Sequence, residues 1–307
     1  MSHWDDPDID PEVSRHKLAW AERLKVPVVL WTPDQVNETI YTAADLFHDR
    51  WEQGELPHET LFVGLLNGAT PFTQPLMRDI TLAGAERGTF IDPRIDYIDV
   101  SRFGNSQTGS EEVTIERNLK RATWHQILTG KVQHIELLDD VIDEGVTSRL
   151  LREDILATIE HARNHPLLAE FVTADPSEIS FGITALVRKR IPQEGMGGFE
   201  RIHGLLEGPA SWLGGMGMDG KDEKYRHLPM VVVAASQDER YREDFAHVIA
   251  TQRQNGFQES SVVNEQCAEA LWLPPKPKEL KSEDDVPLFD VDVFLEQVFA
   301  RELSAVA

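Results

Sequence analysis

The chain has 307 residues, 41% of them hydrophobic, and a formal net charge of −23, which suits one large α/β domain with extensions or two smaller domains. The single cysteine excludes a disulfide framework and a thiolate metal cluster, and it is typical of a reducing cytoplasm. The negative charge argues against nucleic acid, because phosphate backbones are bound by Lys/Arg-rich surfaces. The N-terminal residues lack the apolar region of a signal peptide, and no apolar run reaches the about 20 residues that span a bilayer. We therefore expect a cytoplasmic protein with neither a membrane nor a nucleic acid as its partner.

The chain predicts strands that alternate with helices. Residues 1–25 are polar and read as an N-terminal extension. An apolar run at 26–31 predicts the first strand, and a helix follows it, with Thr32 as N-cap, Pro33 at the first helical position and Gln35 as capping-box partner. Further strands are predicted at 61–68, 94–100, 134–140, 180–189 and 230–235, and helices at 71–82 and 149–162.

This alternation predicts an α/β fold with a mostly parallel, twisted sheet that is flanked by helices. After residue 235 the chain becomes polar and helix-prone, passes a Pro/Lys-rich break at 273–285 and ends in an amphipathic stretch. We therefore expect one α/β domain at 26–235 between the N-terminal extension and a helical C-terminal extension at 236–307. That extension would cover a subunit interface or the mouth of the active site.

The segment DDVIDEGVTS, residues 139–148, carries the clearest chemical pattern. Asp139 and Asp140 stand at the carboxyl end of a predicted strand, where ligands bind in parallel α/β sheets, and Asp143 follows in the loop. Ionised carboxylates accept hydrogen bonds from a sugar diol and bind Mg²⁺, and a third carboxylate near a reacting base could exchange a proton. The alternative is a solvated acidic turn.

The residues after Asp143 predict an anion site. Gly145 permits a tight turn, and we expect Thr147 and Ser148 to cap the following helix. Backbone N–H groups at such a turn and the positive end of the helix suit a phosphate monoester.

This order of an apolar strand, two acidic residues, two apolar residues, Asp and a Gly/Thr loop resembles the motif of type I phosphoribosyltransferases that binds phosphoribosyl pyrophosphate (PRPP). The resemblance to the hypoxanthine–guanine branch of that family extends in order over residues 26–235. It includes a pyrophosphate-loop strand at 61–72, a mobile catalytic loop at 99–115, a strand with a purine-reading lysine at 185–190 and an aromatic-to-Arg segment at 212–233. The resemblance implies the fold of that family, with a small base-binding hood at about 190–229.

The resemblance implies transfer of the 5-phosphoribosyl group from PRPP to a 6-oxopurine (hypoxanthine, guanine or xanthine), which yields a nucleoside monophosphate and pyrophosphate. Asp143 would be the acid/base at the imidazole nitrogen of the purine, and Phe103 would belong to the mobile catalytic loop. The pyrophosphate loop often contains a strained peptide bond in this family. The other implied roles are PRPP binding by Asp139, Asp140, Glu144, Gly145, Val146, Thr147, Leu66, Asn67, Gly68 and Arg226; base binding by Lys189 or Arg188, Trp212 and Leu213; and Mg²⁺ binding by Asp139, Asp140 and Asp219.

The chain departs from the family pattern at three of these positions. Glu144 stands where Thr or Ser is usual, Asn67 replaces the common lysine, and Phe103 replaces a tyrosine. These departures leave open a PRPP- or nucleotide-binding regulator with the same fold and no catalysis. The resemblance also implies a homo-oligomer, either a dimer or a tetramer.

His161 and His165 lie four residues apart near the end of a predicted helix, at a spacing that can ligate a metal. No third ligand is near them in the sequence, so we expect an exposed helix face there.

Overall fold

The computed structural model describes most of the span predicted as the α/β domain, together with one helix near the C-terminus. The described residues are 28–89, 91–102, 113–189, 196–208, 212–218, 225–235 and 291–300, with positions 17, 19, 20 and 23. The elements in chain order are β1 (Val28–Trp31), α2 (Pro33–Glu52), β2 (Thr60–Leu66), α3 (Thr70–Arg87), β3 (Arg94–Arg102), β4 (Val113–Arg117), α4 (Arg121–Leu128), β5 (His134–Ile142), α5 (Val146–Asn164), β6 (Ser180–Lys189), β7 (Arg201–Gly208), β8 (Trp212–Gly214), β9 (Val231–Ala235) and α8 (Val291–Val298).

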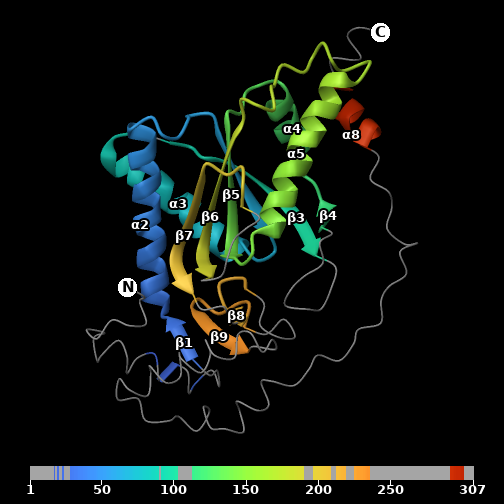
Figure 1. Ribbon diagram of the computed structural model, residues 1–307. Coiled ribbons are helices and arrows are strands. Elements are labelled where there is room, and N and C mark those ends of the chain that lie inside the picture. The colour runs from blue at the N-terminus through green and yellow to red at the C-terminus, as the bar shows by residue number, and fades with distance from the viewer. Residues whose placement is uncertain are drawn as a thin grey trace, which may run out of the picture.

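The main sheet has six strands in the order β4-β3-β2-β5-β6-β7 (Figure 1). Neighbouring strands from β3 to β7 pair in parallel, and β4 pairs antiparallel to β3 at one edge. The central strand β2 consists mainly of buried apolar residues, and β5 buries Ile135, Leu137, Leu138 and Ile142, as expected where helices cover both faces of a parallel sheet. The predicted α/β fold with a mostly parallel sheet is confirmed.

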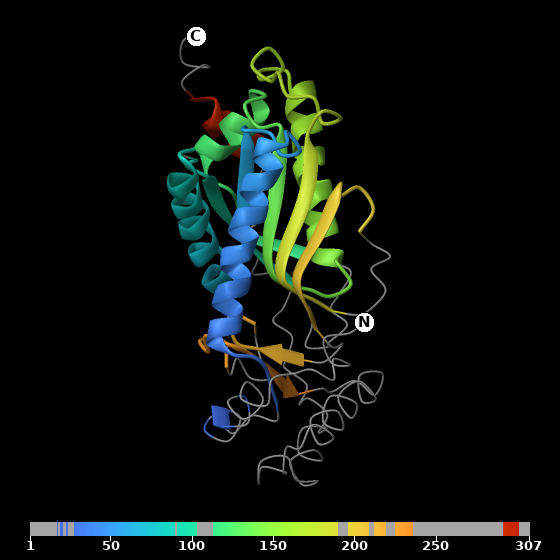
Figure 2. The ribbon, with the colours of Figure 1, turned by 90° about the vertical axis from the view of Figure 1, so that its left-hand side faces the viewer.

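Helices cover both faces of this sheet (Figures 1 and 2). On one face, α2 and α3 pack over a core that includes Phe47, Phe62 and Phe72. On the other face, α4, α5 and α8 pack over a core that includes Trp124 and Phe181. Among the described helices, none is both long enough and apolar enough to cross a membrane.

Helix α2 begins as predicted from its local sequence. The Thr32 hydroxyl accepts a hydrogen bond from the backbone N–H of Gln35 at 3.4 Å, and the Gln35 side-chain oxygen accepts one from the backbone N–H of Thr32 at 3.1 Å. Pro33 stands at the first helical position, where its missing N–H costs nothing. The predicted capping box is confirmed.

The predicted strands at 26–31 and 230–235 form outside the main sheet. They appear as β1 and β9, which pair antiparallel, and β9 also pairs with β8 in a three-stranded sheet. This small sheet lies beyond the carboxyl ends of the main strands (Figure 1). It therefore stands on the side of the molecule where a ligand of the main sheet would bind.

Three elements lack a clear pattern in the sequence. The edge strands β4 and β7 mix charged and apolar residues, because an edge position buries less of a strand than a central one. Helix α4 spans 8 residues, too few for its apolar spacing to be distinctive. Strand β7 pairs with β6 in the main sheet, within the range that the resemblance implied as a hood.

The C-terminal helix α8 packs on α4 and on the end of α5, where Leu295 and Phe299 are fully buried. Asp292 contacts the two histidines that were predicted to lie on an exposed helix face. Its Oδ1 lies 2.7 Å from His161 Nε2 and 3.8 Å from His165 Nε2. The His165 side chain is only 10% exposed, so the prediction of an exposed helix face is wrong for that residue. Helix α8 therefore lies near the C-terminal end of α5, away from the first turn of α5 (Figure 1).

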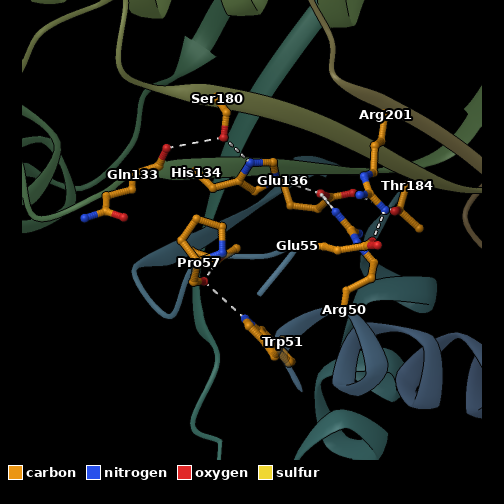
Figure 3. A network of polar contacts seen from close by, with 11 residues as sticks. Arg50, Trp51, Glu55, Pro57, Gln133, His134, Glu136, Ser180, Thr184 and Arg201 are labelled. Carbon is orange, nitrogen blue, oxygen red and sulfur yellow. Dashed lines mark hydrogen bonds and ion pairs between the residues drawn. The ribbon is translucent and has the colours of Figure 1, made fainter. Parts of the chain in front are cut away.

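A buried polar network connects β5, β6 and α2 (Figure 3). The Glu136 carboxylate is fully buried and lies 2.9 Å from His134 Nε2, while the Thr184 hydroxyl donates to it at 2.7 Å. Arg50 of α2 lies 3.7 Å from the same carboxylate. Burial by itself raises the pKa of Glu136, but the hydrogen bonds and the positive charge of Arg50 outweigh it and hold the pKa below its ordinary value. The group is therefore a carboxylate at neutral pH.

Candidate functional site

The order of the strands determines where the site lies. After β2 the chain builds β3 and β4 on one side, and it then returns to place β5 on the other side of β2. The helix after β2 covers one face of the sheet and the helix after β5 covers the other. The connections therefore diverge and leave a crevice beyond the carboxyl ends of β2 and β5, the switch point where ligands bind in open α/β sheets.

A cavity of about 300 Å³ occupies this position. It brings together the end of β2, the end of β5 and the first turn of α5. Its lining consists of Leu65, Leu66, Gly68, Val100, Asp139, Asp140, Val141, Ile142, Asp143, Gly145, Val146, Thr147 and Ser148.

The loop after β2 forms one wall. The peptide bond between Leu66 and Asn67 is cis, and the Asn67 side chain is exposed. Gly68 lies directly against the Asp140 carboxylate, where an added Cβ would stand 2.4 Å from Oδ2. Only glycine allows the loop and the carboxylate to approach this closely.

Asp139 and Asp140 are consecutive residues near the end of β5, which continues two residues further, to Ile142, than the predicted strand. The Asp140 backbone N–H donates to the Asp139 carboxylate at 2.9 Å, and the Val141 N–H donates to the Asp140 carboxylate at 3.0 Å. Burial and the neighbouring charge of Asp140 raise the pKa of Asp139 well above its usual range. Both effects disfavour a second negative charge, so a cation bound here would be stabilised.

The opposite wall is the start of α5. Gly145 has a φ of 78°, which suits glycine, and its carbonyl accepts the first helical hydrogen bond, from Arg149, at 3.0 Å. The prediction that Thr147 and Ser148 cap this helix is wrong. Because α5 begins at Val146, both residues lie inside its first turn, and no side-chain hydrogen bond caps the helix. The first turn of α5 contains no acidic residue, and N–H groups at the start of a helix have no intrahelical partner and can bind an anion.

Asp143 stands between these walls and contacts the end of β6. Its Oδ2 lies 2.9 Å from Lys189 Nζ, and the two side chains are 28% and 11% exposed. Arg188, the alternative to Lys189 in the sequence, packs across Gly204 of β7, where an added Cβ would stand 2.1 Å from its Cβ. Of these two basic residues, Lys189 is the one that pairs with Asp143.

The segment that follows β8 contacts the loop after β2 through Gly217. Gly217 has a φ of 94°, and a Cβ there would overlap the carbonyl oxygen of Gly68. Its N–H donates to the Arg226 carbonyl at 2.9 Å, so the backbone at Arg226 is hydrogen-bonded to the residue that contacts Gly68. Leu213 is 3% exposed and packs in the core.

Three predicted residues have no described side chain. Phe103 and Asp219 lie outside the described residues, and Trp212 is described only as part of β8. In the described part of the chain, no three His, Cys, Asp or Glu side chains are grouped to hold a metal ion. The lining also contains residues that the sequence did not single out: Leu65, Val100, Val141 and Ile142. Their apolar character marks strand ends and gives no signal of its own for a site.

The site therefore combines adjacent carboxylates and a helix N-terminus at the switch point of a parallel sheet, a combination that can bind an anion and a cation. No known protein-family profile matches the chain. In sequence, it is 32% identical over 93 residues to hypoxanthine-guanine phosphoribosyltransferase of Bacillus subtilis, covering 30% of this chain and 43% of that protein. It is 30% identical over 119 residues to the bifunctional protein TilS/HprT of Listeria innocua, covering 39% of this chain and 15% of that protein. The chain thus spans less than half the length of these curated relatives, and the predicted resemblance in sequence is confirmed.

Solved structures of hypoxanthine phosphoribosyltransferases are also similar to this chain. One from Staphylococcus aureus has 18% identity and a TM-score of 0.48, covering 68% of this chain and 92% of that one. Another, from Trypanosoma cruzi in complex with the product IMP, has 19% identity and a TM-score of 0.47, covering 67% and 92%.

Proposed function

We propose that the protein transfers the 5-phosphoribosyl group from PRPP to a 6-oxopurine and releases pyrophosphate. The observation that carries the proposal is the cavity at the switch point, which Asp139, Asp140 and Asp143 line together with the first turn of α5. The sequence similarity to hypoxanthine-guanine phosphoribosyltransferase supports the same activity.

The first turn of α5 would hold the 5′-phosphate of PRPP through the N–H groups of Val146, Thr147 and Ser148. The carboxylates of Asp139 and Asp140 would accept hydrogen bonds from the two ribose hydroxyls. A ligand that contacts both groups would carry a phosphate at one end and hydroxyls near its middle, which is the pattern of a ribose phosphate.

The donors at Asp139 and Asp140 also fit Mg²⁺. This ion prefers oxygen ligands and is usually held by one or two carboxylates together with substrate phosphates and water. The raised pKa of Asp139 reflects burial and repulsion from Asp140, and a nearby cation would relieve the repulsion. When bound, Mg²⁺ supplies positive charge that stabilises the leaving pyrophosphate.

The pair of Asp143 and Lys189 would read and activate the base. Lys189 has only donors, so it suits the 6-oxygen of an oxopurine, and Asp143 would take the proton that the imidazole nitrogen loses. Gly68 and the cis peptide before it would face the pyrophosphate, and Arg226 would stabilise its charge.

A single assay tests the activity. The protein is incubated with PRPP, Mg²⁺ and each of hypoxanthine, guanine, xanthine, adenine and uracil, and pyrophosphate release is measured. We expect release with a 6-oxopurine and a loss of at least about 100-fold in kcat for Asp143→Asn. The matched control Asp175→Asn, in the exposed turn before β6, should keep wild-type turnover. Unchanged turnover in Asp143→Asn contradicts the assigned acid/base role.

The second candidate is a PRPP- or nucleotide-binding regulator without catalysis. It is favoured by the exposed Asn67, which provides no cation at the pyrophosphate loop, and by Glu144, which adds a negative charge just before the phosphate site. PRPP binding by calorimetry, without release of pyrophosphate from PRPP in the presence of any of these bases, would establish this regulator and exclude the enzyme. The homo-oligomer and the division into extensions and a domain at 26–235 remain proposals.

A further inference from the structure

Two residues on either side of the connection between β6 and β7 contact the candidate phosphate loop, residues 143–148. Lys189, the last residue of β6, pairs with Asp143 at 2.9 Å. Met196, which precedes β7, is 4% exposed and packs in the core on the α5 side of the sheet. Both contacts fall within the three residues from Asp143 to Gly145.

The contact at Gly145 is very close. A Cβ added to Gly145 would stand 1.9 Å from the Met196 sulfur and 2.6 Å from its Cγ, so the thioether fills the space where any other residue would carry a side chain. Gly145 is also the residue at which the chain turns into α5, with a φ of 78°. Met196 therefore packs against the point that sets the direction of the first helical N–H groups.

Met196 is itself held in place by the residues that follow it. Gly198 lies against the guanidinium of Arg152 on α5, where an added Cβ would be 2.5 Å from Cζ. Phe199 packs edge-on against Phe181 with ring centroids 6.4 Å apart, and the Glu200 N–H donates to the Phe181 carbonyl at 2.8 Å. The segment from 196 to 200 is thus anchored to both α5 and β6.

We propose that Met196 is a positioning residue for the phosphate site: its thioether holds Gly145 so that the N–H groups of Val146, Thr147 and Ser148 converge on the 5′-phosphate. Met196 lies outside the residues that line the cavity, and it acts through Gly145. The inference rests on the proposed function, since it names the support of that phosphate site.

The test compares two buried methionines. Met196→Ala removes the contact with Gly145, whereas Met77→Ala removes a buried methionine from α3, in the core on the other face of the sheet. Binding of ribose 5-phosphate is measured by calorimetry and PRPP turnover by pyrophosphate release. We expect Met196→Ala to raise the Kd for ribose 5-phosphate and the KM for PRPP by about tenfold or more, with kcat within about twofold. Met77→Ala should lower the melting temperature but leave both constants unchanged.

Two further variants keep the proposal testable if Met196→Ala folds poorly. Met196→Leu keeps the volume of the side chain and should restore binding to within about twofold of wild type. Gly145→Ala should weaken binding, and this loss should be smaller in the Met196→Ala background, because the side chain that it collides with has been shortened.

The outcomes separate the inference from the proposed function. Wild-type protein that binds neither ribose 5-phosphate nor PRPP overturns the proposed function, and the inference with it. If Met196→Ala binds ribose 5-phosphate as tightly as the wild type, or if Met77→Ala weakens this binding to the same extent, only the positioning role is overturned.

Discussion

The ion pair between Arg50 and Glu136 offers a direct test of the forces that stabilise the sheet. The two side chains are 4% and 0% exposed, and the carboxylate also contacts His134 and Thr184 (Figure 3). Gly182 makes room for it, because a Cβ there would stand 2.2 Å from its Oε2. Replacing Arg50 by alanine would leave the Glu136 carboxylate buried and hydrogen-bonded, but without a positive charge from Arg50 to compensate its own charge.

The expected cost follows from that burial. Removing one partner of a buried ion pair costs about 3–5 kcal/mol of unfolding free energy, because the remaining charge is left without compensation. This loss is a large part of the about 5–15 kcal/mol that stabilises a typical domain. In a domain of 150–250 residues it corresponds to a fall of roughly 6–20 °C in melting temperature.

The loss should also depend on pH. In the wild type the pKa of Glu136 lies below its ordinary value of about 4.5, so its contribution to stability is present above that value and is lost as the pH falls below it. Without Arg50, burial is less opposed and the pKa of Glu136 rises. The difference in stability between wild type and Arg50→Ala should therefore be largest at neutral pH and should narrow as the pH approaches 4.5.

Urea denaturation of both proteins between pH 7 and pH 5 measures this difference. As a control, Arg78→Ala removes an arginine whose side chain is 64% exposed and should leave the midpoint nearly unchanged. The double variant Arg50→Met/Glu136→Gln removes both charges and should lose less stability than Arg50→Ala alone. A loss below about 1 kcal/mol for Arg50→Ala, or an equal loss in the double variant, would refute the reasoning.

Two other substitutions test the loop after β2 and the helix α8. Gly68→Ala should reduce kcat/KM for PRPP by at least about tenfold, because its Cβ would displace Asp140; near-normal steady-state kinetics would contradict the close approach seen here. Leu295→Ala should cost about 2–5 kcal/mol of unfolding free energy, because Leu295 is fully buried between α8 and the core. As a control, Leu82→Ala, at a leucine that is 52% exposed, should change the free energy of unfolding by no more than about 0.5 kcal/mol. Equal losses for Leu295→Ala and Leu82→Ala would mean that α8 does not pack on the domain.

Local patterns were sufficient for much of the fold. The start of α2 follows from Thr32, Pro33 and Gln35, because a capping box involves neighbours within one turn. Buried strands such as β2 and β5 show as apolar runs, because both of their faces are covered. The positions of Asp139 and Asp140 near a strand end follow from where such a run stops, although β5 continues two residues beyond Asp140, to Ile142.

Contacts between distant parts of the chain required the tertiary structure. The choice of Lys189 over Arg188 as the residue facing Asp143 depends on which face of β6 turns toward the loop, and a shift of one residue reverses it. The edge strands β4 and β7 bury too little surface to leave a clear pattern.

The same holds for the contacts of single side chains. Met196 lies on Gly145 and Asp292 lies beside His161 although 50 or more residues separate the partners. In each case the contact arises from packing of whole elements. By itself, the sequence determined the carboxylates and glycines of the proposed ribose phosphate site. The strand order, which places β5 beside β2, decided that these residues meet in one cavity. With this order, the connections that follow β2 and β5 run to opposite faces of the sheet and leave a crevice between them.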